Sequence, residues 1–295
     1  MLALIAPIGR LTYSRRSCWL VSPPYSALEF EIVRVGTDVH DTVTDVAAAE
    51  EPLELRLGGQ PFVVIMRTPG ADRDLATGFL FSEGIISTAS DITSIRHCTD
   101  ENGEDIPNVL SVWLDGDAAV RAQRALAGRR HVAANSSCGV CGRRSIDDLL
   151  SGRRAVTSPM TVPRAVIESL PASLRASQLT FDQTGGLHAA GLFSPDGRLL
   201  RSAEDVGRHN AVDKVIGASL IAADPQLDRT VLFVSGRTSF EIVQKAVVAA
   251  IPIVAAVSAP SSLAIALARE AGLTLIGFVR GCGFNIYTGQ ERVVL

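Results

Sequence analysis

The chain has 295 residues, of which 47% are hydrophobic, and its formal net charge is −3. This charge gives no overall attraction to nucleic acid, and no segment approaches the ~20 apolar residues of a membrane-spanning helix. The apolar run at residues 2–8 is too short for a secretion signal. Five scattered cysteines favour a reducing compartment over a disulfide framework. We therefore expect a cytoplasmic protein that binds neither nucleic acid nor membrane.

The first half of the chain is predicted to be rich in β-structure. Residues 1–27 show no periodicity and are predicted to form a poorly structured extension. Leu53–Leu57 alternates between apolar and polar side chains, and Gly58–Gly59 offers a turn into a second apolar run. Strands and helices are expected, in the order strand, strand, helix, strand, helix, at residues 53–57, 62–66, 72–86, 109–114 and 118–126. We assign residues 28–134 to a smaller β-rich (α+β) N-terminal domain.

The second half alternates strands with helices. A turn signal at residues 194–197 separates two strands of a hairpin. Further strands are expected at residues 231–234, 253–257 and, as the last strand, 273–279, and helices at residues 210–223, 239–249 and 262–271. Uniformly apolar strands that alternate with helices indicate a largely parallel sheet covered by helices. We assign residues 146–295 to an α/β domain that binds a cofactor.

Two cysteines lie in a short polar segment between these domains. Cys138 and Cys141 form a C-x-x-C motif in the loop at residues 135–145, where glycines follow each cysteine. A thiol reacts as the thiolate, and nearby guanidinium groups lower its pKa. Arginines that would supply such a positive environment lie at positions 121, 124, 129, 130, 143, 144, 153 and 154. The pattern favours a loop that handles sulfur.

Three other interpretations of the cysteine motif stay open. A structural zinc site needs four ligands, and His97, Cys98 and His131 form no second pair with suitable spacing. A thioredoxin-type dithiol follows a buried strand directly, and residues 131–137 do not resemble one. The cysteines could also be inert structural residues, although reactivity explains a cysteine more often than packing does.

Polar loops follow the predicted strands of the second half. Ligands of open α/β sheets bind beyond the carboxyl ends of the strands. Residues 204–210, 235–239, 258–262 and 280–288 fall there, and free N–H groups at helix starts favour phosphate. Arg208, Arg237 and Arg280 would add bidentate contacts. We expect a large anionic ligand, bound by Asp205, Arg208, His209, Ser235, Gly236, Arg237, Thr238, Ser239 and Arg280.

Ordinary structural roles compete with binding at several of these positions. Serine and threonine are common helix caps, and His209 is compatible with a cap as well. Asp205 suits either a structural contact with Arg208 or a contact with a ribose or base. His188 alternates with apolar residues on a strand, so a core or cleft histidine is at least as plausible as a catalytic one. Of 28 basic residues only Lys214 and Lys245 are lysines, and both lie close to these loops.

Several motifs together resemble the FdhD family of accessory sulfurtransferases for formate dehydrogenase. They are Ser137–Gly142, Thr184–His188, Asp205–Lys214, Ser235–Glu241 and Phe284–Thr288. The resemblance covers residues 28–295, includes both lysines and implies a cytidine-deaminase-like C-terminal domain. It also implies a homodimer.

The resemblance implies a mechanism and its participants. A cysteine desulfurase would pass sulfur to Cys138 as a persulfide, with Cys141 as its partner. The sulfur would then reach the molybdenum (or tungsten) of a bis-guanine-dinucleotide pterin cofactor before insertion into apo-formate dehydrogenase. The cofactor would contact Phe284, Asn285, Ile286, Tyr287, Thr288 and Gly289, and no resident metal or zinc is implied.

Three alternatives belong to other functional classes. Zinc deaminases need H-x-E before P-C-x-x-C, whereas His188 lacks the glutamate and the cysteine motif precedes it. A non-catalytic cofactor chaperone would bind the same cofactor without using the thiols. A thiol-disulfide oxidoreductase would cycle both cysteines through a disulfide.

Overall fold

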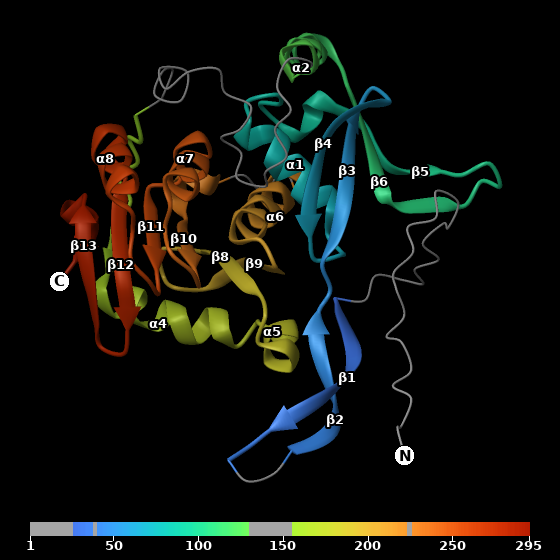
Figure 1. Cartoon of the computed structure of the whole chain (residues 1–295). Coiled ribbons are helices and arrows are strands. Elements are labelled where there is room, and N and C mark those ends of the chain that lie inside the picture. The colour runs from blue at the N-terminus through green and yellow to red at the C-terminus, as the bar shows by residue number, and fades with distance from the viewer. Residues whose placement is uncertain (1–25, 38–39, 130–154, 223–225) are drawn as a thin grey trace.

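A computed structural model describes residues 26–37, 40–129, 155–222 and 226–295 (Figure 1). The predicted extension lies outside these residues except for its last two positions, and so does the whole of the predicted loop at residues 135–145. Within the described ranges no helix combines the length and apolar character needed to cross a bilayer. The chain forms mixed α/β structure.

The largest sheet has six strands in the order β13-β12-β11-β10-β8-β9. Only β10 with β11 and β11 with β12 pair in parallel. The hairpin β8–β9 and the strand β13 are antiparallel to their neighbours. The strands are β8 His188–Phe193, β9 Leu199–Asp205, β10 Val231–Val234, β11 Ile253–Ala256, β12 Thr274–Arg280 and β13 Gly283–Thr288.

This sheet confirms the predicted hairpin and the predicted α/β order, and it corrects two expectations. The sheet is mixed, because parallel pairing is limited to its centre. The strand that was expected to be the last is followed by β13, which turns back at Gly281 (φ +56°) and partly buries Phe284 and Ile286 against the core. The cytidine-deaminase-like arrangement and the domain limits stay predictions.

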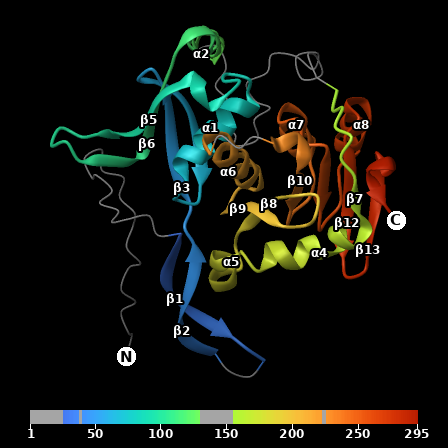
Figure 2. The same ribbon diagram turned by 180° about the vertical axis from the view of Figure 1, so that it is seen from behind.

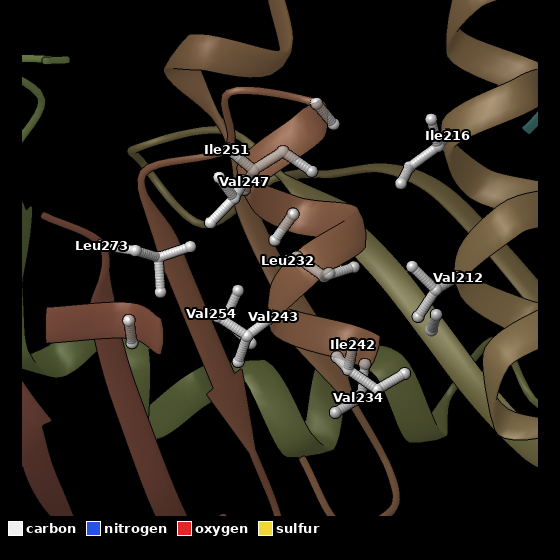
Figure 3. Packing of buried hydrophobic residues seen from close by; sticks show 14 of the residues in the cluster. Val212, Ile216, Leu232, Val234, Ile242, Val243, Val247, Ile251, Val254 and Leu273 are labelled. Atoms are coloured by element: carbon white, nitrogen blue, oxygen red, sulfur yellow. The ribbon is translucent and has the colours of Figure 1, made fainter. Parts of the chain in front are cut away.

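Helices cover both faces of the six-stranded sheet (Figures 1 and 2). Alternate strand residues such as Leu232 and Val254 pack under α6, α7 and α8 (Figure 3). Their neighbours Phe233 and Ile253 pack against α4 on the other face. This double burial explains why the strands are apolar at every position. The helices are α4 Arg164–Arg175, α5 Leu179–Thr184, α6 Arg208–Ile221, α7 Phe240–Val248 and α8 Ser262–Ala271.

A four-stranded sheet in the order β4-β3-β6-β5 forms the N-terminal part of the described chain. Leu53, Leu55 and Leu57 are buried on one face, as their alternation predicts, and the turn lies at Gly58–Gly59. The helix α1 ends before the predicted Ile86, since Gly84 adopts φ +70°. The elements are β3 Glu51–Leu57, β4 Gln60–Arg67, α1 Asp72–Ser82, β5 Ile92–Thr99, β6 Asp105–Leu114 and α2 Gly116–Arg129.

Helices α1 and α6 join the two sheets through a close crossing. A Cβ atom at Gly78 of α1 would overlap the carbonyl oxygen of Asp213, and one at Gly217 of α6 would overlap that of Asp74. Glycine is required at both positions because the backbones themselves touch. This crossing holds the segment that precedes α1 against the end of β9.

The remaining strands form two small pairs. An antiparallel ribbon of β1 (Ala27–Val35) and β2 (His40–Ala48) projects away from the body of the molecule (Figure 1). The sequence predicted only β-rich structure for the residues of this ribbon. The parallel pair of β7 (Val162–Pro163) and β14 (Val293–Val294) lies near the C-terminus.

Candidate functional site

The candidate site is the rim at the carboxyl ends of β9, β10, β11 and β12. The strand β8 runs in the opposite direction, so its first residue His188 lies at the same edge, paired with Asp205. The structure therefore brings the loops predicted from sequence to one edge of the sheet. The polar side chains of these loops differ in orientation, however: some face solvent and others face the protein interior.

Asp205 faces the interior. It is fully buried, and its carboxylate lies 2.7 Å from the Lys214 ammonium. The carboxylate also accepts hydrogen bonds from the backbone of Thr68 and Gly207 and from the Asn210 amide, at 2.8–3.2 Å. Direct contact with a ribose or base, one of the two expectations from sequence, is thus not supported. Asp205 instead holds the rim loop in place.

His209 is bonded within the rim. Its Nε2 lies 2.7 Å from a carboxylate oxygen of Glu241 and 3.1 Å from the hydroxyl of Ser239. Ser239 occupies the N-cap position of α7, yet its side chain makes no capping hydrogen bond. The pair of His209 and Ser239 therefore links the starts of α6 and α7.

Positive charges surround His188. A Cβ atom on Gly236 would lie 3.2 Å from His188 Nδ1, so the glycine lets the loop after β10 approach the ring. Burial is the first cause that lowers the pKa of His188, followed by the positive charges of Arg208 and His209, with a smaller effect from Arg237. Asp205 opposes this shift. The loops after β9 and β10 therefore place positive charge beside a half-buried imidazole.

Arg208 and Thr238 carry unused hydrogen-bonding capacity. The Nε of Arg208 and the hydroxyl of Thr238 are buried and have no hydrogen-bond partner in the described parts of the chain. Arg237 is exposed on the same loop as Thr238. A buried donor without a partner costs free energy, which a bound anion would recover. These groups fit the predicted phosphate site.

Other rim residues have structural roles. The Ser235 hydroxyl accepts a hydrogen bond from Ala189 N at 2.9 Å. Ser261 caps α8 through Ala264 N, the ordinary role that its residue type suggested. Backbone hydrogen bonds from Thr238 to Ala259 and from Ser261 to Thr238 hold two loops side by side.

The closing segment is strand β13 and the turn after it. Phe284, Asn285 and Ile286 line a cavity of about 540 Å³ with Arg164. The Thr288 hydroxyl donates to Leu273 O at 2.7 Å and accepts from Leu275 N at 3.1 Å. Gly289 adopts φ +65°. Thr288 and the carbonyl of Gly289, which accepts from the Thr274 hydroxyl at 2.7 Å, therefore hold β13 against β12.

Two further predicted residues differ in exposure. The Arg280 side chain is exposed, and its Nε donates to Val257 O at 3.0 Å. Its guanidinium carbon lies 5.5 Å from the centre of the Phe278 ring. Tyr287 packs against the larger core, and its ring would lie 3.1 Å from a Cβ atom at Gly277. Of the two, only Arg280 presents charge to solvent.

The predicted persulfide residues Cys138 and Cys141 lie outside the described residues. Two other cysteines are described: Cys282 is exposed in the turn before β13, and Cys98 is half-buried in β5. Among described residues no group of three or more His, Cys, Asp and Glu side chains could hold a metal ion. Arg121 is one of the arginines expected near the thiols. Its guanidinium donates hydrogen bonds to Ile85 O and to the Asp91 carboxylate.

A second cavity, which the sequence does not predict, lies beside α4. This cavity of about 660 Å³ reaches from Arg175 and Gln178 to His188 and Ser235. The helical spacing of Ile167, Leu170 and Leu174, which are buried, would have predicted α4. No local pattern marks Gln178 as a cavity residue, because the cavity forms only when α4 meets the sheet.

The fold and the rim define an α/β protein with a cationic, donor-rich site at one end of a mixed sheet. Comparison with known proteins narrows this class. The sequence model of the FdhD/NarQ family matches residues 48–294 of this chain. The chain therefore belongs to the FdhD/NarQ family.

Individual relatives agree with this assignment. A Streptomyces coelicolor protein named sulfur carrier protein FdhD is 48% identical over 270 residues, which cover 90% of this chain and 95% of the relative. A Nocardia farcinica protein of the same name is 52% identical over 257 residues, covering 84% and 88%. The crystal structure of a candidate formate dehydrogenase accessory protein from Desulfotalea psychrophila matches with a TM-score of 0.71 at 26% identity, covering 92% of this chain and 100% of that one.

Proposed function

We propose that the protein is a sulfur carrier that supplies sulfur to formate dehydrogenase through its molybdenum (or tungsten) bis-guanine-dinucleotide pterin cofactor. The observation that carries the proposal is the C-x-x-C motif of Cys138 and Cys141 in a chain whose relatives are named sulfur carriers. A cysteine desulfurase and apo-formate dehydrogenase would be its partners. We further propose that it acts in the cytoplasm as a homodimer.

The first step of the proposed chemistry is persulfide formation. The Cys138 thiolate attacks the terminal sulfur of a persulfide on the desulfurase. An S–S bond forms on Cys138, the S–S bond on the desulfurase breaks, and the desulfurase cysteine leaves as a thiolate. The chain gains one sulfur atom, and no electrons enter or leave the pair of proteins.

The second step is sulfur delivery. The Cys141 thiolate attacks the inner sulfur of the persulfide, a disulfide forms between Cys138 and Cys141, and the outer sulfur leaves as sulfide to become a ligand of the metal. The two electrons come from the two cysteine sulfurs, and a thiol reductant restores both thiols.

The rim and the β13 cavity are proposed to hold the cofactor. Its phosphates would face Arg208 and Arg237. The unpartnered Nε of Arg208 and the positive charges around His188 support this placement. The first residues of the closing segment, Phe284–Ile286, would contact a guanine. Asp205 would act from below by holding the loop that carries Arg208.

The sulfur proposal is tested by intact-protein mass spectrometry after incubation with a cysteine desulfurase and cysteine. We expect wild-type protein to gain one sulfur atom that a reductant removes, and Cys138→Ala to lose this gain. Cys282→Ala, which removes an exposed cysteine of the described chain, is the matched control and is expected to load normally. No added sulfur on the wild type would contradict the proposal, and retained GDP binding would then favour the cofactor chaperone.

The cofactor half of the proposal is tested separately with Arg237→Ala. Arg237 is exposed, so its removal is expected to leave the free energy of unfolding within about 0.5 kcal/mol of wild type. GDP affinity, measured by calorimetry, is expected to fall by about tenfold with the loss of a charged hydrogen bond. Unchanged affinity would place the phosphate site elsewhere.

A further inference from the structure

The four-stranded sheet has an outer face, opposite the face on which α1 and α2 pack. Leu55 and Leu57 of β3 and Leu110 and Val112 of β6 point inward and belong to the core beneath these two helices. Side chains alternate along a strand, so the residues between them point to the other side of the sheet. Ser111, which lies between Leu110 and Val112, therefore belongs to the outer face.

Ser111 is the unusual residue of this outer face. It is only 6% exposed, and its buried hydroxyl has no hydrogen-bond partner in the described parts of the chain. A serine hydroxyl can donate one hydrogen bond and accept others. Leaving a buried group of this kind without a partner costs free energy, and folded proteins usually provide one. The hydroxyl therefore points to a ligand.

Two arginines flank Ser111 on the neighbouring strands. Arg56 of β3 is its partner in the parallel register, and Arg96 of β5 is its partner in the antiparallel register. Paired residues project from the same face of a sheet, and neighbouring strands lie about 4.8 Å apart. The three side chains therefore form a row across the outer face, in which the serine hydroxyl lies between two guanidinium groups. We call Arg56, Ser111 and Arg96 the outer-face row.

The outer-face row carries a surplus of positive charge. The Nε of Arg56 lies 2.6 Å from a carboxylate oxygen of Glu54, which leaves the two terminal nitrogens of this guanidinium available. The side chain of Arg96 is exposed and forms no ion pair with any carboxylate of the described residues. One carboxylate thus balances two guanidinium groups, and an anion between them would relieve their repulsion.

The donors of the row favour a tetrahedral oxyanion. Guanidinium groups bind phosphate through pairs of N–H donors, and the serine hydroxyl adds a donor between them. Three donor groups from three strands suit a ligand with at least three oxygens, whereas a carboxylate has only two. Trp113, two residues beyond Ser111 on the same face, is 45% exposed. Its indole could contact an apolar group attached to the oxyanion.

We propose that Arg56, Ser111 and Arg96 bind a phosphate group on the outer face of the N-terminal sheet. The Ser111 hydroxyl donates to one phosphate oxygen, and the two guanidinium groups donate to the others. The phosphate is either free or part of a small phosphate monoester. This inference goes beyond the proposed function, because the outer-face row shares no residue with the rim or with the cysteine motif.

The test follows the fluorescence of Trp113 during titration with sodium phosphate or phenyl phosphate at constant ionic strength. The chain has two tryptophans, so Trp19→Phe leaves Trp113 as the single emitter and serves as the parent protein. We expect a saturable change with phosphate. Arg96→Met should weaken binding by about tenfold or more, through loss of a charged hydrogen bond. Arg73→Met, at an exposed arginine of α1, is the matched control and should bind like the parent.

The two titrants distinguish the sources of the phosphate. Equal affinity for both would assign the row to free phosphate, since the phenyl ring then adds nothing. Tighter binding of phenyl phosphate would assign it to a monoester whose apolar part contacts Trp113, and Trp113→Leu, followed by calorimetry, should then remove the difference.

Ser111→Ala tests the hydroxyl itself. Phosphate binding is expected to weaken by about three- to tenfold, the effect of one neutral hydrogen bond. In buffer without phosphate the urea midpoint should equal that of the parent or rise, because the substitution removes a buried donor that has no partner. A lower midpoint would show that the hydroxyl already has a partner and would overturn the proposal.

Other results would also overturn it. One is the absence of a saturable change with either titrant, and another is the same change with sodium chloride at equal ionic strength. A third is phosphate affinity of Arg96→Met and Ser111→Ala equal to that of the parent. Each of these would leave the outer face as an ordinary solvated side of a sheet.

Discussion

The two lysines of this chain form two buried ion pairs that differ in their surroundings. Lys245 of α7 lies 2.8 Å from both carboxylate oxygens of Asp213 in the helix layer. Lys214 of α6 lies 2.7 Å from Asp205 below the rim. Both pairs also connect the N-terminal segment to the larger sheet, the first through Ser82 and the second through Thr68. The same chemistry therefore appears once within the helix layer and once beneath the candidate site.

The helix-layer pair has few alternative partners. Burial raises the pKa of the Asp213 carboxyl, and the Lys245 ammonium and the Ser82 hydroxyl oppose that rise. The ammonium also lies 5.8 Å from the Phe79 ring centre. Without Lys245, one serine hydroxyl would remain to compensate a fully buried carboxylate.

The rim pair belongs to a larger network. Asp205 has three further donors, in Thr68, Gly207 and Asn210, and the Lys214 ammonium also donates to the carbonyl of Thr68. Thr68 in turn accepts from Val206 N through its hydroxyl. Such a network fixes the loop that presents Arg208, so damage to it is expected to reach ligand binding. Because the two pairs have similar distances, we expect their neighbours to decide whether each serves stability alone.

The largest effect is expected for Lys245→Met. Removing one partner of a buried pair leaves an uncompensated carboxylate, so the free energy of unfolding is expected to fall by about 3–5 kcal/mol. Urea unfolding measures this loss. The double variant Lys245→Met/Asp213→Asn should recover part of it, and GDP affinity of the folded single variant should match wild type. A loss below 1 kcal/mol, on the order of a surface pair, would contradict this account.

A smaller loss of stability and a new loss of affinity are expected for Lys214→Met. The three remaining donors compensate part of the Asp205 charge, so we expect about 2–3 kcal/mol by urea unfolding. GDP affinity should fall as well, because the loop that carries Arg208 loses its anchor. Affinity equal to wild type at a temperature where the variant is fully folded would remove the distinction between the two pairs.

The smallest effect is the pH dependence of binding through His188. Its pKa is lowered in the free protein, and a bound anion would raise it, so binding takes up a proton. GDP affinity is therefore expected to increase as pH falls from the pKa of His188 in the complex toward its lowered pKa in the free protein, by up to about tenfold for each unit between the two. His188→Asn should flatten this dependence, whereas His40→Asn, at an exposed histidine of β2, should preserve it. Calorimetry in buffers of different ionisation enthalpy measures the proton uptake.

Stability gives an independent check of the same shift. Because the folded pKa of His188 is lower than the unfolded value near 6.5, its contribution to stability is complete above pH 6.5 and is lost as pH falls toward the folded pKa. His188→Asn should reduce the slope of stability against pH in that window. A slope that stays unchanged would show that another group titrates there.

Much of this molecule was predictable from local sequence. Alternation at Leu53–Leu57, the turn at residues 194–197 and the apolar runs of β10 and β11 each depend on neighbours a few residues apart, and all were confirmed. The motifs also sufficed to identify the family, since their residue types and order are specific. The role of the cysteine motif in carrying sulfur stays a prediction, as do the assigned ligand contacts.

What only the tertiary structure decided were the roles of single polar residues and the direction of the outer strands. Asp205 bonds to Thr68, 137 positions away, so no local pattern could show that its carboxylate faces inward. Phe284 and Ile286 pack against a core that contains residues of α4 and β12. Strand β13 therefore forms, although the sequence of this segment predicts a loop. Gln178 lines a cavity only after α4 has packed on the sheet. Propensity and motif act over a few residues, whereas burial and hydrogen-bond partners are properties of the assembled fold.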